Sequence, residues 1–156
     1  MQAGRSHSHT APKTPDVNVL VAPARLEHPH HKTALHWLEH AVNLTSGKHR
    51  LALLPGVIAG FLRITTNRKI FPAPTPIEAA IGFIDDILDS ASVSVLTSAR
   101  EWPQLRALCL QKSLIANSIP DAWIAAQVLE HREVLATFDR DFTQHLPSAS
   151  LLLLKP

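Results

Sequence analysis

Apolar residues follow two alternating spacings along the chain. Residues 30–44 carry Ala34, Leu38 and Ala41 three and four positions apart, which is the spacing of an amphipathic helix. Residues 51–54 and 134–138 are short continuous apolar runs, typical of strands that are covered on both faces. Further strands are predicted at residues 93–96 and 151–154, and further helices at residues 57–65, from residue 75 onward, at 101–112 and at 121–131.

Strands that alternate with helices predict parallel pairing, because each helix carries the chain back to start the next strand in the same direction. The predicted fold class is therefore α/β, a three-layer α/β/α sandwich around a mostly parallel central sheet. Residues 15–156 are expected to form a single domain, and residues 1–14 a flexible N-terminal tail. The Pro-rich residues 71–76 are interpreted as a stiff connector between helices, with a partner-binding edge as the alternative.

Composition narrows the class of protein. The chain has 156 residues, 46% of them hydrophobic, which is enough for one globular core. The formal net charge of +2 is compatible with nucleic acid, which needs a local basic patch rather than a large net charge. A single cysteine, Cys109, excludes a disulfide within the chain and favours the reducing cytoplasm. No apolar run approaches the ~20 residues of a membrane helix, so no membrane association is expected.

Carboxylates cluster in the last third of the chain. Asp121 opens a predicted helix, and Asp139 directly follows the predicted strand at residues 134–138. Parallel strands end at one edge of their sheet, where α/β folds place their chemistry. Carboxylates gathered there suit hard cations such as Mg²⁺ or Mn²⁺, although an Asp at either position is also explained by helix capping or a turn.

Five motifs follow one another in a recognisable order. They are Asp-x-Asn-Val-Leu from residue 16, His-Pro-His-His from 28, Phe-Leu-Arg-Ile-Thr-Thr-Asn-Arg-Lys-Ile-Phe from 61, Pro-Asp-Ala-x-Ile-Ala-Ala from 120 and Thr-Phe-Asp-Arg-Asp-Phe from 137. In order and spacing they resemble the PIN-domain family, and more narrowly the VapC-type toxins of bacterial toxin–antitoxin pairs. The resemblance covers the chain from Asp16 to its C-terminus.

The resemblance implies a PIN-like fold and a Mg²⁺- or Mn²⁺-dependent endoribonuclease in which metal-activated water cleaves RNA phosphodiesters. It also implies a toxin role, a homodimer, an RNA substrate and a VapB-type antitoxin as partner. Mapped onto the motifs, the catalytic acids are Asp16, Asp121 and Asp139, the metal ligands are Asp16 and Asp121, and the auxiliary residues are Asn18, Thr137 and Asp141.

Two departures from the family pattern bear on activity. Gly60 stands where the family usually has a Glu, so one expected acid is missing. Pro12 and Pro15 precede Asp16 where the family has an apolar strand, which predicts either a very short first strand or an irregular segment. These departures leave open a degenerate PIN domain that binds antitoxin or RNA without cutting. A PIN nuclease outside any toxin pair is a third reading.

The best basic patch comprises Arg63, Arg68 and Lys69, which follow or end the helix at residues 57–65. These cations either contact RNA phosphates or simply favour the C-terminal end of the helix dipole. His28, His30 and His31 are dense, but a zinc site needs a second cluster of ligands, which the sequence lacks. Trp123 is interpreted as a core or dimer contact rather than a stacking platform for bases.

Overall fold

The computed structural model describes residues 13–43, 51–97, 100–116 and 118–156. Within these residues, short strands form one sheet in the order β3-β2-β1-β4-β5, and each neighbouring pair is parallel. The strands are β1 (Lys13–Pro15), β2 (Leu51–Leu53), β3 (Val93–Val95), β4 (Val134–Thr137) and β5 (Leu151–Leu153). The predicted α/β class is confirmed, and every pair in the sheet proves parallel.

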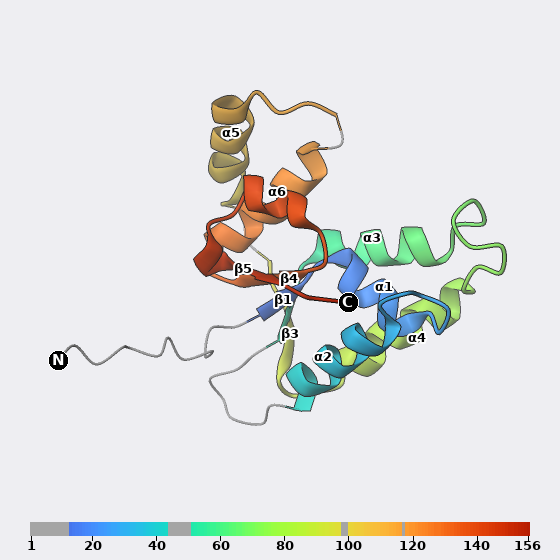
Figure 1. The fold of residues 1–156 in the computed structure, drawn as a ribbon. Coiled ribbons are helices and arrows are strands. Elements are labelled where there is room, and N and C mark those ends of the chain that lie inside the picture. Colours follow the sequence, from blue (N-terminus) through green and yellow to red (C-terminus); the bar gives the residue numbers. More distant parts are fainter. Residues whose placement is uncertain (1–12, 44–50, 98–99, 117) are drawn as a thin grey trace.

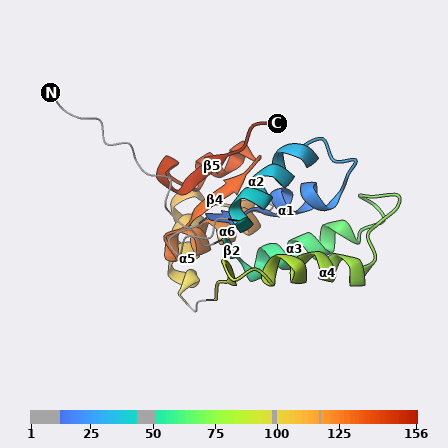
Figure 2. The same ribbon diagram turned by 90° about the horizontal axis from the view of Figure 1, so that it is seen from below.

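Helices cover both faces of the sheet. They are α1 (Val17–Ala24), α2 (His31–Asn43), α3 (Pro55–Thr65), α4 (Ile77–Leu88), α5 (Glu101–Lys112) and α6 (Ser118–Glu130), with 3-10 turns η1 (Arg140–Gln144) and η2 (Ser148–Ser150). In Figure 1, α5 and α6 lie on one side of the sheet and α2 and α4 on the other. Helices α3 and α4 lie side by side in both views and extend beyond the sheet (Figures 1 and 2).

The first strand is short rather than irregular. β1 pairs with β4 through all three of its residues, but with β2 only at Lys13 opposite Leu51. Pro15 has no N–H to give to a neighbouring strand, and it occupies the last position of β1, where pairing with β2 has already ended. Residues 13 and 14 belong to this strand, so the ordered domain begins before the expected boundary at residue 15. Residues 1–12 of the expected tail lie outside the described residues.

Helix α1 was not anticipated from the sequence. Its valines are β-branched and favour strands when considered alone. Asp16 caps the helix, however, and residues 19–23 are buried, so packing outweighs the weak intrinsic preference.

Three helix starts differ from the sequence prediction by two residues or more. Helix α3 begins at Pro55 rather than at residue 57. Helix α6 begins at Ser118, which places Asp121 in its first turn rather than at its cap. The N-cap of α4 is Pro76, and the Thr75 hydroxyl instead accepts a hydrogen bond from Arg25. Leu44, the expected end of the helix predicted at residues 30–44, lies outside the described residues.

The candidate acids lie near the carboxyl edge of the sheet. Asp16 follows β1, Leu54 precedes α3 after β2, and Asp139 follows β4, and these three strands are neighbours at the centre of the sheet. Helix α6 leads into the parallel strand β4, so its first turn lies near the same edge. No helix in the described part of the chain is both long enough and apolar enough to cross a bilayer.

Candidate active site

Asp16 lies at the carboxyl end of β1 and caps α1. Its Oδ1 accepts a hydrogen bond from the Val17 N–H at 2.7 Å, and its Oδ2 accepts one from the Thr137 hydroxyl at 2.7 Å. Burial raises the pKa of this carboxyl to about 6, opposed by the two hydrogen bonds and reinforced by Asp121 and Asp139. The carboxylate is therefore held in one orientation where a negative charge is costly.

Thr137, the last residue of β4, connects the expected site residues. Its buried hydroxyl donates to Asp16, accepts from the Asp139 N–H at 3.0 Å and accepts weakly from the Asn18 side-chain amide at 3.4 Å. The Asn18 Oδ1 in turn accepts from the Phe138 N–H at 3.5 Å. One hydroxyl thus ties the end of β4 to the start of α1.

Asp121 and Asp139 share this region with Asp16. The pKa of Asp121 is raised first by burial and then by the charge of Asp139, with Asp141 adding a smaller increase and His145 opposing it. Asp139 thus opposes the ionisation of Asp121, as it opposes that of Asp16. Asp139 caps η1 through a hydrogen bond from the Asp141 N–H to its Oδ1 at 2.8 Å.

A groove of about 980 Å³ opens beside the acids, and Asp16 and Asp121 contribute to its lining. Its walls come from α1, α3 and α6 and from the segment after α3, and most of them are apolar. Of the three basic residues expected at the site, Arg63 lines the groove, while Arg68 and Lys69 are exposed outside it.

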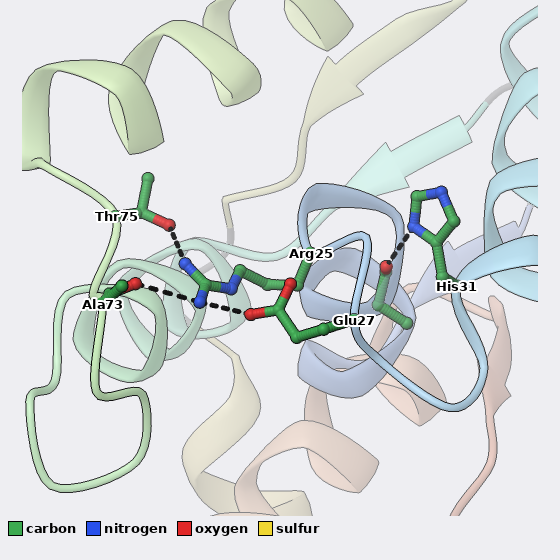
Figure 3. Close-up of polar contacts among 6 residues, drawn as sticks. Arg25, Glu27, His31, Ala73 and Thr75 are labelled. Atoms are coloured by element: carbon green, nitrogen blue, oxygen red, sulfur yellow. Dashed lines mark hydrogen bonds and ion pairs between the residues drawn. The ribbon is translucent and has the colours of Figure 1, made fainter.

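The Pro-rich segment that helps to wall the groove is held by Arg25. Its guanidinium donates to the Thr75 hydroxyl and to the Ala73 carbonyl, each at 3.0 Å, and pairs with Glu27 (Figure 3). It also lies 4.2 Å from the ring centroid of Phe71, which lines the groove. Arg25 is therefore engaged in fixing this wall.

Comparison with known families matches residues 13–145 to the model described as PIN domain. The chain belongs to the PIN domain family. Ribonuclease VapC25 and Ribonuclease VapC37 of Mycobacterium tuberculosis are each 34% identical to it, over 130 and 131 residues. Each match covers 83% of this chain and 89% of the relative.

Solved structures share the PIN fold with this chain. VapBC2 from Rickettsia felis, bound to a DNA fragment from its promoter, aligns with a TM-score of 0.63 and 19% identity over 92% of this chain and 99% of that one. VapBC-1 from nontypeable Haemophilus influenzae aligns with a TM-score of 0.60 and 18% identity, covering 91% and 97%. The family expected from the sequence motifs is thus confirmed.

Gly60 has a structural reason in this PIN domain. A Cβ at Gly60 would lie 2.9 Å from Cγ2 of Val17, which is closer than carbon atoms pack. Gly60 therefore lets α3 approach α1 next to Asp16. A Glu at this position requires Val17 to move, so the missing acid is linked to how closely these two helices pack.

The donor set suits a hard cation held by few protein ligands. In the described ranges, no group of three or more His, Cys, Asp or Glu side chains converges closely enough to hold a metal ion. Mg²⁺ commonly takes one or two carboxylates and keeps several waters, which two acids in an open groove allow. The raised pKa values of Asp16 and Asp121 reflect burial and charge repulsion that a cation would relieve. The site therefore fits Mg²⁺ or Mn²⁺ bound by Asp16 and Asp121.

Sequence reasoning missed part of the lining of the groove. His28, Trp123 and Gln127 line it, although none had been assigned a role in the site. The available signal was the helical spacing, because Trp123 and Gln127 lie four residues apart on the helix that carries Asp121. The side of this helix that faces α3 became visible only once the two helices were placed.

Proposed function

We propose that this PIN domain is a metal-dependent endoribonuclease and the toxin of a toxin–antitoxin pair. The observation that carries the proposal is the position of the acids at the carboxyl edge of the sheet, with Asp16 after β1, Asp139 after β4 and Asp121 in the first turn of α6. Asp16 and Asp121 line the same groove. The relatives named ribonuclease VapC support the reaction class.

Each residue has a task in hydrolysing an RNA phosphodiester. Asp16 and Asp121 would hold the cation, and the Thr137 hydroxyl fixes the orientation of the Asp16 carboxylate through its 2.7 Å hydrogen bond. Asp139 would add to the negative charge that attracts the cation. Arg63, exposed on the groove wall, contacts the substrate backbone. When bound, Mg²⁺ or Mn²⁺ supplies a more acidic water and neutralises charge on the phosphate.

The partner we propose is a VapB-type antitoxin. The solved relatives include VapBC complexes, and an apolar groove beside the acids suits a covering polypeptide segment. An Arg from such a segment would neutralise the acids and block the metal. We also propose that the toxin acts as a homodimer.

The test compares RNA cleavage by the wild type and by Asp121→Asn, with Mg²⁺ or Mn²⁺ present. A metal ligand contributes several kcal/mol of transition-state stabilisation, so D121N is expected to lose at least about a hundredfold in rate. Asp85→Asn, an exposed change on α4, is the matched control and should cleave like the wild type. Equal rates for D121N and the wild type would contradict the proposal.

A second candidate is a PIN domain that binds but does not cut. The absence of an acid at Gly60 favours it. Calorimetry with Mn²⁺ separates the two, because a binding-only protein is expected to give no heat with Mn²⁺ and no RNA cleavage. Heat from the wild type that is lost in D121N would support the ribonuclease instead.

A further inference from the structure

Two side chains on α6 face the groove beyond the catalytic acids. Trp123 and Gln127 both line it and lie four residues apart, hence on one face of the helix. Trp123 is large, apolar and 47% exposed, although it lies next to a buried core. Gln127 is only 6% exposed, and its Oε1 has no hydrogen-bond partner in the part of the chain that the structure describes.

The opposite wall packs against them without a side chain of its own. Gly56, in the first turn of α3, also lines the groove. A Cβ at Gly56 would lie 3.6 Å from Cζ3 of Trp123 and 4.0 Å from Oε1 of Gln127. The indole and the amide therefore stand together opposite a backbone that carries no side chain.

An aromatic face with an unpaired amide oxygen beside it matches the needs of an unpaired nucleobase. Bases in single-stranded RNA stack on aromatic side chains and are read through hydrogen bonds at their edges. A Gln amide offers both a donor and an acceptor to such an edge. A buried amide without a partner is costly in the free protein, so a ligand that completes it gains affinity.

The position along α6 fits the reaction. At a rise of 1.5 Å per residue, Gln127 lies about 9 Å along the helix axis from Asp121, and Trp123 about 3 Å. All three side chains line the same groove, so a nucleotide adjacent to the bond held at the acids can place its base here. A peptide covering the groove would use the whole apolar wall, whereas this corner offers one flat ring and one hydrogen-bonding edge.

We propose that Trp123 and Gln127 form a subsite for one unpaired nucleobase of the RNA substrate, with the indole stacking on the base and the amide selecting it. The proposal rests on the proposed ribonuclease function. It makes α6 carry both an acid of the reaction and the residues that choose where the RNA is cut.

The first arm of the test measures binding in EDTA, where cleavage does not occur. Short unstructured RNA oligonucleotides that vary at one base are titrated against the wild type, Trp123→Ala, Gln127→Leu and Gln127→Glu. W123A should bind all of them about tenfold or more weakly, since stacking tolerates every base. Q127L should lose the difference between the best and the worst base, and Q127E should change which base is preferred.

Matched controls come from α5. Trp102→Ala removes an exposed indole and Gln111→Leu an exposed amide, both away from the groove, and both variants should bind like the wild type. Thermal melting of each variant shows that it is folded. The second arm maps cleavage positions with Mn²⁺, where Q127E should shift the base at the cut.

The outcomes separate the subsite from the ribonuclease function. Base-dependent binding that W123A and Q127L abolish, without any cleavage, supports the subsite and overturns the nuclease. Cleavage with unchanged base preference in all variants overturns the subsite and leaves the nuclease standing. No RNA binding by the wild type overturns the subsite. Variants that bind RNA normally but lose an apolar peptide, or change oligomeric state, also overturn it in favour of a protein contact.

Discussion

At the scale of single residues, buried polar groups decide how this PIN domain responds to its surroundings. Asp16 is buried with two hydrogen bonds to its carboxylate, so it has an orientation as well as a raised pKa. Glu133, just before β4, is equally buried, but its Oε2 has no hydrogen-bond partner among the described residues. The hydrogen bonds fix the orientation of the Asp16 carboxylate, whereas the unpaired oxygen of Glu133 lowers the stability of the fold.

Glu133 predicts how stability depends on pH. Burial raises its pKa from 4.5 to about 7 in the folded protein. A raised folded pKa means that the folded state binds the proton more tightly, so stability is greatest below about pH 4.5 and is lost as the pH rises through about 7. The loss from this one group is about 3 kcal/mol. Glu133→Gln should flatten this part of the profile and be more stable than the wild type at pH 8.

Urea denaturation between pH 4 and 8 measures the effect. Asp16 titrates within the same window, so the informative quantity is the difference in slope between the wild type and E133Q. Glu78→Gln, an exposed change on α4, is the control and should keep the wild-type slope. Identical slopes for E133Q and the wild type would show that Glu133 does not titrate in this way.

At the scale of elements, the contact between α1 and α3 shapes the site. Helix α1 directly follows the strand that carries Asp16, and α3 passes it with Gly60 against Val17. A β-branched valine has little freedom to move aside, so the separation of the two helices is set by the absence of a side chain at Gly60.

Gly60→Ala therefore tests the packing of these helices. In a helix interior, Gly→Ala ordinarily stabilises by about 1 kcal/mol, whereas overpacking costs about 1–3 kcal/mol. G60A is expected to gain nothing or to lose stability in the wild type, and to stabilise by about 1 kcal/mol when Val17→Ala has removed the clash. Urea midpoints of the four proteins in this double-mutant cycle give the coupling.

Gly82 in α4 supplies the matched comparison. A Cβ there meets nothing within 4 Å, so Gly82→Ala should stabilise by about 1 kcal/mol in either background. If G60A stabilised the wild type as much as G82A does, the close approach of α3 to α1 would be refuted.

At the scale of the whole molecule, the groove depends on segments that are distant in the sequence. Arg25, after α1, holds residues 73 and 75, which follow α3 (Figure 3). Its guanidinium also lies over the ring of Phe71. The planar guanidinium makes these contacts in different directions at once. The contacts of Arg25 therefore join two loops of the fold and position one wall of the groove.

Removing the Arg25 side chain should destabilise the domain. Hydrogen bonds to charged groups contribute about 1.5–3 kcal/mol when buried, and the bond to the Ala73 carbonyl is exposed, so Arg25→Ala is expected to cost about 2–3 kcal/mol in all. Arg25→Lys should recover little, because an ammonium lacks the fork that reaches both acceptors. Chemical denaturation checks both variants. Glu27→Ala removes only an exposed partner and should cost clearly less than Arg25→Ala, so equal losses for E27A and R25A would contradict this account.

The sequence alone predicted the α/β class, the family and most of the helices and strands, because apolar spacing and motif order are local properties of the chain. It offered Asp121 and Asp139 as candidates, since each stands at the start of a predicted helix or the end of a predicted strand, and the family resemblance added Asp16. It did not identify α1, whose β-branched residues favour a strand until burial selects the helix.

Only the tertiary structure decided how these parts meet. The hydrogen bond from Thr137 to Asp16 joins residues 121 positions apart, and the spacing of apolar residues carries no information about such a contact. The close approach of Val17 to Gly60 and the corner formed by Gly56, Trp123 and Gln127 depend in the same way on how helices cross. Local patterns place residues on elements, whereas the packing of elements places side chains against one another.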